Sequence, residues 1–140
     1  MQYRQQLTAD VEDWLRQDIP AALQGIYSIY GAAPPVPENI GANLPLVIPE
    51  RIGGNRYSLV IDSHTVAFDV YAHTWAEAQE AAGQVVAAIN ELPFRTSNAA
   101  GVYYSTQITT LPYNNPDPRH PDIPRVSVNA SVATRTQPSI

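Results

Sequence analysis

The chain has 140 residues, a formal net charge of -5 and no cysteine, and its eight cationic residues are all arginine. This length fits one domain with a single hydrophobic core, and the missing cysteines exclude a disulfide framework, a thiol nucleophile and a cysteine-ligated metal. The acidic balance argues against a protein that binds nucleic acid by neutralising phosphates.

The beginning of the sequence does not have the pattern of a signal peptide. Residues 1–14 are polar and acidic, whereas a signal peptide is basic and then apolar. The chain also contains no apolar run of about 18 residues or more. We therefore expect a soluble, intracellular product without a membrane partner.

The first expected element is a helix over residues 8–24. Either Thr8 or Asp10 is suited to be its N-cap, and acidic residues follow in the first turn, where the helix dipole favours them. Pro20 should kink this helix or divide it in two. The apolar residues that repeat at helical spacing are Val11, Trp14, Leu15, Ile19, Ala22 and Leu23.

A connector is expected over residues 31–45, because prolines and glycines are too frequent there for regular structure. Residues 46–52 predict a strand, in which Pro49 favours an edge position or a bulge.

Two turns are then expected on either side of a short strand. The sequence Gly53-Gly54-Asn55 predicts the first turn, and residues 62–64 predict the second. The apolar run of residues 57–61 lies between them, and we expect the strands here to be antiparallel neighbours.

The centre of the expected core is a strand followed directly by a helix. Val66, Phe68 and Val70 alternate with more polar residues, which predicts a half-buried strand. After His73 the apolar spacing changes to three and four, which predicts a helix over residues 74–92. A T-x-x-E capping box, starting at Thr74, opens this helix, and the proline after residue 92 ends it.

The last part of the chain predicts a hairpin with an outsized loop. Residues 94–101 are expected to be a loop, and residues 102–111 a strand in which Val102, Tyr104 and Ile108 share one side and Tyr103 lies on the other. Residues 112–124 contain five prolines and predict an irregular loop of the kind that is usually functional or flexible. Residues 125–134 predict the final strand.

The tail of residues 135–140 is expected to be flexible. The elements thus follow the order helix, strand, strand, helix, strand, strand in one domain spanning residues 1–140. They predict an α+β fold, with a four-stranded, mostly antiparallel sheet over residues 46–134 and helices packed on one of its faces. The other face carries uncharged polar side chains and is expected to be wet or pressed against another copy.

Residues that could carry chemistry lack the spacing of known sites. No H-x-x-x-H or H-E-x-x-H pair occurs among His64, His73 and His120. Asp62, Ser63 and His64 have the identities of a catalytic triad, but three consecutive residues cannot adopt its geometry. We therefore expect no enzyme activity, no cofactor and no metal.

Four stretches together resemble the tail terminator proteins of long-tailed bacteriophages, particularly those that infect actinobacteria. They are the Trp14-Leu15 pair, LPLVIPERIGG (44–54), VAFDVYAHTWAEAQEAAGQVVAAINELP (66–93) and PDIPRVSVNASV (121–132). The likeness extends over about residues 9–134. The likeness lies in the order of the elements and in short sequence patterns over most of the chain.

The resemblance implies a structural virion protein, located at the tail-head junction after assembly in the host cytoplasm. Such a subunit forms a hexameric ring, caps the tail tube, ends its polymerisation and joins the tail to the head. Its partners are copies of itself, the tail tube protein and the head-tail connector protein, and double-stranded DNA passes through the channel without specific binding.

A ring of this kind needs complementary protruding loops more than a pocket. Tyrosine and arginine are enriched at interface cores, although strand preference alone explains the tyrosines equally well. The candidate subunit or tube interface residues are Arg51, Gly53, Gly54, Arg56, Tyr57, Tyr113, Asp117, Arg119 and Arg125.

An acidic channel would keep the duplex mobile by repelling its phosphates. The candidate residues for that surface are Glu50, Asp62 and Asp69. Three other interpretations stay open: a head-completion, stopper or neck protein in the same machine, a monomeric peptide- or ligand-binding module, and, last, a hydrolase that uses histidine and aspartate.

Overall fold

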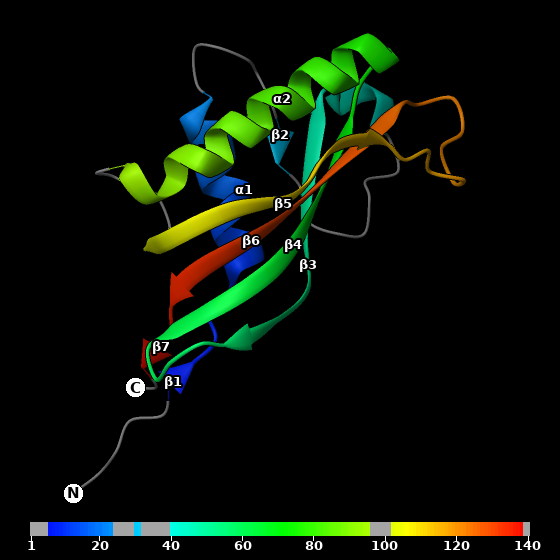
Figure 1. The fold of residues 1–140 in the computed structure, drawn as a ribbon. Helices are drawn as coiled ribbons and strands as arrows, with labels where there is room; N and C mark the ends of the chain where they lie inside the picture. The colour runs from blue at the N-terminus through cyan, green and yellow to red at the C-terminus, as the bar shows by residue number, and fades with distance from the viewer. Residues whose placement is uncertain (1–5, 24–29, 32–39, 96–101, 139–140) are drawn as a thin grey trace, which may run out of the picture.

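The computed structural model describes residues 6–23, 30–31, 40–95 and 102–138. It is an α+β fold in which two helices cover one face of a curved antiparallel sheet (Figure 1). The four long strands are antiparallel, as the sequence predicts, and they lie side by side in the order β3, β4, β6, β5. Their bounds are β3 (Leu46–Arg56), β4 (Ile61–Tyr71), β5 (Tyr103–Asn114) and β6 (Arg125–Arg135).

Short elements complete the structure. β2 (Tyr30–Gly31) pairs in parallel with the start of β3, and β1 (Gln6–Leu7) pairs with β7 (Gln137–Pro138) in a separate small sheet. Two 3-10 helices, η1 (Ile40–Asn43) and η2 (Leu92–Phe94), precede β3 and follow the second long helix.

The core lies between the sheet and the helices α1 (Val11–Ala22) and α2 (Trp75–Glu91). α1 packs against β3 and α2, and α2 packs over β5 and β6. Val66, Phe68 and Val70 of β4 are fully buried on the covered face, which confirms the predicted alternation. The covering side of α2 is rich in alanine, and this lets the helix lie close to the sheet.

The predicted helix signals are largely confirmed. The Thr74 hydroxyl accepts the Glu77 N–H at 3.1 Å, and α2 ends at Glu91 just before Pro93 enters η2. At α1 the N-cap is Asp10, whose carboxylate accepts the Asp13 N–H at 3.2 Å, so the helix begins later than residue 8. Pro20 lies inside α1, which continues to Ala22 without being divided in two.

The two turns predicted around residues 53–55 and 62–64 are wrong. Both segments lie inside long strands, and the single turn between β3 and β4 is formed by residues 57–60. A bulge between Arg51 and Gly53 shifts the register, and Gly54 then has φ of +141°. A Cβ on Gly54 would collide with the Ser63 carbonyl oxygen. The glycine therefore permits close strand pairing and does not form a turn.

The predicted alternation of Tyr104 and Ile108 against Tyr103 is also wrong, because Tyr103 and Ile108 both pack against the core. A bulge between Tyr103 and Ser105 turns Tyr103 into the core, where its hydroxyl donates to the buried Asp18 carboxylate at 2.6 Å. The Trp14 ring meets the Tyr103 ring edge to face at 6.0 Å. Tyr104 is left exposed.

The predicted loop and tail are shorter than expected. Residues 112–114 belong to β5, an edge strand that can tolerate Pro112, so the loop before β6 covers residues 115–124. The flexible tail is wrong for residues 135–138, because Arg135 closes β6, Thr136 is buried and the next two residues form β7. Most of the predicted connector and of the loop over residues 94–101 lies outside the described residues.

Candidate functional site

The structure distributes the predicted site residues between two ends of the sheet. The hairpin end is the end with the β3–β4 turn (57–60), where Arg51, Arg56 and Asp62 lie. The loop end is the opposite end, with residues 115–124, and it holds Asp117 and Arg125 (Figure 1). The predicted interface residues therefore form two separate groups.

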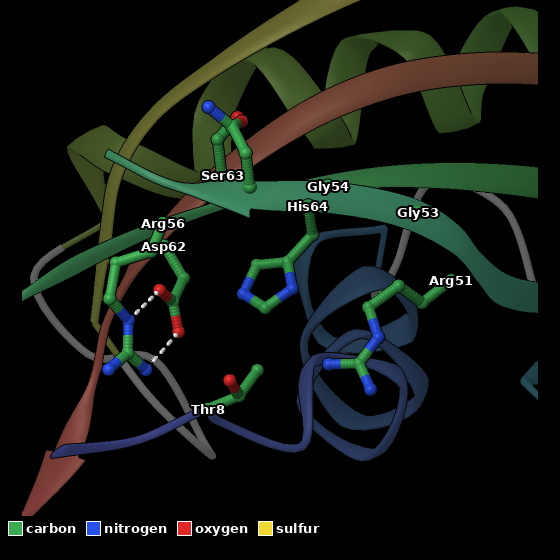
Figure 2. Close-up of a pocket in the computed structure, with 9 residues that line it drawn as sticks. Thr8, Arg51, Gly53, Gly54, Arg56, Asp62, Ser63 and His64 are labelled. Carbon is green, nitrogen blue, oxygen red and sulfur yellow. Dashed lines mark hydrogen bonds and ion pairs between the residues drawn. The ribbon is translucent and has the colours of Figure 1, made fainter. Parts of the chain in front are cut away.

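A pocket of about 360 Å³ opens at the hairpin end, between β3, β4 and the segment that precedes α1 (Figure 2). Its position follows from a change of residue type along one face of β4. The apolar residues of the covered face give way to His64 and Asp62, so the hydrophobic core stops there. The lining residues are Thr8, Arg51, Gly53, Gly54, Asn55, Arg56, Asp62, Ser63 and His64.

One wall of the pocket is an ion pair across the hairpin. The Arg56 guanidinium donates to both oxygens of Asp62, at 2.7 and 3.1 Å, and also to the Gln6 carbonyl at 2.9 Å. The hydrogen bonds from Arg56 hold the pKa of Asp62 below its usual value. Asp62 is therefore ionised, and its charge is balanced by Arg56.

His64 lies in the middle of the pocket (Figure 2) and is buried. Its Nε2 lies 2.8 Å from the Thr134 hydroxyl oxygen. Burial lowers the pKa of His64, and the nearby charge of Arg51 lowers it further. The ring is therefore neutral near pH 7.

Arg51 extends from β3 into the other side of the pocket and is exposed (Figure 2). Among the described residues, no carboxylate lies within ion-pair distance of its guanidinium. With a neutral His64, two guanidinium groups and one carboxylate leave the pocket with an excess of one positive charge. This arrangement can bind an anion, and a carboxylate fits the planar guanidinium best.

The loop end is tied together by internal contacts. Buried Asp117 accepts the Tyr71 hydroxyl at 2.8 Å and the Arg119 N–H at 3.0 Å, and Arg125 Nη1 lies 3.6 Å away. Burial opposes ionisation of Asp117, but the hydrogen bonds from Arg119 and Tyr71 outweigh it and lower its pKa. Burial raises the pKa of Tyr71 to about 12. Ile123 packs against the apolar cluster around Tyr71.

The proline-rich loop is thus held against the sheet at Asp117 and Ile123. Arg125 also donates to the Asn115 carbonyl at 2.6 Å, so it anchors the start of the same loop. Asp117 and Arg125 are engaged within the subunit, whereas Arg119 and Tyr113 remain exposed. The loop could not be placed from the sequence, because its anchors come from β4 and β6.

The three candidate residues of an acidic surface do not lie together. Asp62 is on the helix-covered face and is neutralised by Arg56, whereas Asp69 and Glu50 are on the open face. Asp69 accepts the Ser127 hydroxyl at 2.7 Å and lies 4.0 Å from Arg125. Asp62 therefore does not share a face with Asp69 and Glu50, and the acidic surface stays a prediction for the latter two residues.

The sequence identified Tyr57 as an interface candidate, but it did not identify two other exposed apolar side chains of the hairpin end, Leu59 and Ile52. Tyr57 is 77% and Leu59 80% exposed in the β3–β4 turn, and Ile52 is 57% exposed on β3. The apolar run of residues 57–61 could have revealed them, but it predicts a strand equally well. Only the register of the hairpin identifies this run as its turn.

Comparisons with known proteins add no assignment. No model of a protein family matches the chain, and no curated protein matches it. Within the described residues, no group of three or more His, Cys, Asp or Glu side chains is placed to hold a metal ion. In the same part of the chain, neither helix has both the length and the apolar character needed to cross a membrane.

Proposed function

We propose that this chain is a structural subunit and not an enzyme. It assembles with copies of itself into a closed ring that caps a phage tail tube. In this role the ring ends tube polymerisation and joins the tail to the head connector, inside the virion. The observation that carries the proposal is a sheet with two unpaired edges. Among the described residues, β3 has no outer neighbour from Ile48 to Arg56, and β5 has none along its length.

Unpaired strand edges expose backbone donors and acceptors that another strand can satisfy. All neighbours among the four long strands are antiparallel, so β3 and β5 run in opposite directions. If copies are related by rotation about an axis along the strands, β5 of one copy meets β3 of the next in antiparallel orientation. This head-to-tail contact can repeat until the ring closes.

The phage role rests on the resemblance over about residues 9–134, and the α+β fold which that resemblance implies is the fold of this chain. The open face of the sheet supports passage of DNA without specific binding. Ser63 and Ser131 face each other there at 3.0 Å between hydroxyl oxygens, and the chain as a whole is acidic. Neither feature attracts phosphates.

The test is the mass and shape of the purified protein, alone and mixed with polymerised tail tube protein. Light scattering should give a particle of about 92 kDa, six times the 15.3 kDa chain. Negative-stain images should show rings at tube ends, and tubes should stop growing when the protein is added. Single subunits that ignore the tube under all these conditions would overturn the proposal.

Two alternatives make different predictions. A head-completion, stopper or neck protein would form the same ring but bind the connector and not the tube, so binding to each partner separates the two. A monomeric ligand-binding module is favoured by one observation, the pocket with Arg51, with which no carboxylate of the described residues forms an ion pair. It predicts a monomer that binds a small carboxylate, measurable by calorimetry.

A further inference from the structure

The pocket at the hairpin end lies beside one of the unpaired strand edges. Arg51 and Gly53 belong to the part of β3 that has no described outer neighbour. A Cβ built on Gly53 would meet no atom within 4 Å, so no described atom of the subunit covers the strand at this residue. A group from a neighbouring molecule could therefore reach Arg51.

Arg51 also carries the positive charge of the pocket that no carboxylate of the described residues balances. Arg56 already donates to both oxygens of Asp62, whereas no carboxylate of the described residues pairs with Arg51. The chain itself carries thirteen acidic residues against eight arginines. A second copy of this chain is therefore a chemically suitable source of the missing carboxylate.

The other unpaired edge, β5, has an acidic residue near the end that would face the pocket. α2 runs antiparallel to β5, because Gln79 Nε2 donates to Asn114 Oδ1 at 2.8 Å and the Thr106 hydroxyl donates to the Ile89 carbonyl at 2.8 Å. Glu91, the last residue of α2, thus lies near the N-terminal end of β5, and it is exposed.

Antiparallel docking of β5 on β3 would bring these groups together. The N-terminal end of β5 would lie beside the C-terminal end of β3, where the pocket opens. A sheet that continues between two copies keeps its helix-covered face on one side, and both Glu91 and Arg51 belong to that side. Resting on the ring proposed above, we infer that Glu91 of one copy enters the pocket of the next copy and pairs with Arg51.

The test exchanges the two charges in the full-length chain. Arg51→Glu and Glu91→Arg should each raise the dissociation constant of the ring by about tenfold or more. Each variant places two like charges together at every interface between neighbouring subunits. The double variant should restore ring stability to within about threefold of the original, since the pair is rebuilt in reverse. Sedimentation velocity and light scattering measure both effects, with tube protein present if the ring forms only on the tube.

The matched control is Glu80→Arg, an exposed acidic residue near the other end of α2. It should leave ring dissociation unchanged, and circular dichroism should show that all variants are folded. Rings that withstand both single changes, or that the double change does not restore, would overturn the Arg51–Glu91 pairing while leaving the ring intact. The pairing would also be overturned if acetate bound at Arg51 while Arg51→Glu left ring dissociation unchanged. If the unchanged protein forms no ring even with tube protein, the proposed function fails instead.

Discussion

The covered and uncovered parts of β4 differ in chemistry although they share one strand and one face. Phe68 and its apolar neighbours are fully buried beneath the helices, whereas His64 and Asp62, at the hairpin end, border an open pocket. The covered part thus belongs to the hydrophobic core, whose apolar burial stabilises the fold. The hairpin end is left free to present charged and apolar groups to another molecule.

The two loops that the sequence suggests as interaction arms differ in the same way. The proline-rich loop is long, but buried Asp117 and partly buried Ile123 hold it against the sheet. The β3–β4 turn is short, yet Tyr57 and Leu59 in it are among the most exposed large side chains of the described residues. Length and proline content therefore do not identify the arm that protrudes; the positions of anchoring residues do.

The largest expected effect on stability comes from the covered part. Phe68→Ala should lower the free energy of unfolding by about 3–5 kcal/mol, because it removes a fully buried ring and leaves a cavity. Leu59→Ala in the exposed turn is the matched control and should change it by less than about 0.5 kcal/mol. Urea denaturation of both variants measures the contrast, and similar losses would show that the hairpin end also carries the fold.

A smaller effect is expected at the loop end. Asp117→Ala should lower the free energy of unfolding by about 1–3 kcal/mol, because the Tyr71 hydroxyl and the Arg119 N–H lose their acceptor. Asp122→Ala, which removes an exposed acid from the same loop, should have little effect. Limited proteolysis should cut the loop faster in Asp117→Ala alone. Equal cleavage of both variants would mean that Asp117 does not hold the loop.

The elements that could be predicted from sequence are those specified by local signals. The helix opened by Thr74 and the alternation of Val66, Phe68 and Val70 depend on residues a few positions apart, and both are confirmed. The order and class of the fold follow from such elements. The predicted position of the β3–β4 turn was wrong, because Gly53-Gly54 is a local turn signal. Strand pairing instead places these glycines beside β4.

The candidate site was harder to predict for the same reason. The sequence identifies Arg51 and Arg56 as interface candidates, but it cannot show that Arg56 pairs with Asp62, since that depends on where the hairpin turns. The sequence also names Asp62 and Asp69 as candidates for one acidic surface, but their positions in β4 differ by seven, an odd number, so they lie on opposite faces of the strand. Side-chain direction and ion pairing both depend on the pairing register of β3 and β4, which the local sequence signals do not specify.

The smallest expected effect is a pH dependence that originates at the hairpin end. The pKa of His64 is lowered from 6.5 in the folded protein, so below pH 6.5 the unfolded chain binds a proton that the folded chain resists. The stabilisation is complete above pH 6.5 and declines as the pH falls through that value, with a slope of at most about 1.4 kcal/mol per pH unit for one proton. Denaturation between about pH 5 and 8 should show this slope, and His64→Asn should remove it. His73→Asn, at an exposed histidine, should keep it; if the His73 variant removes the slope instead, the buried ring is not its source.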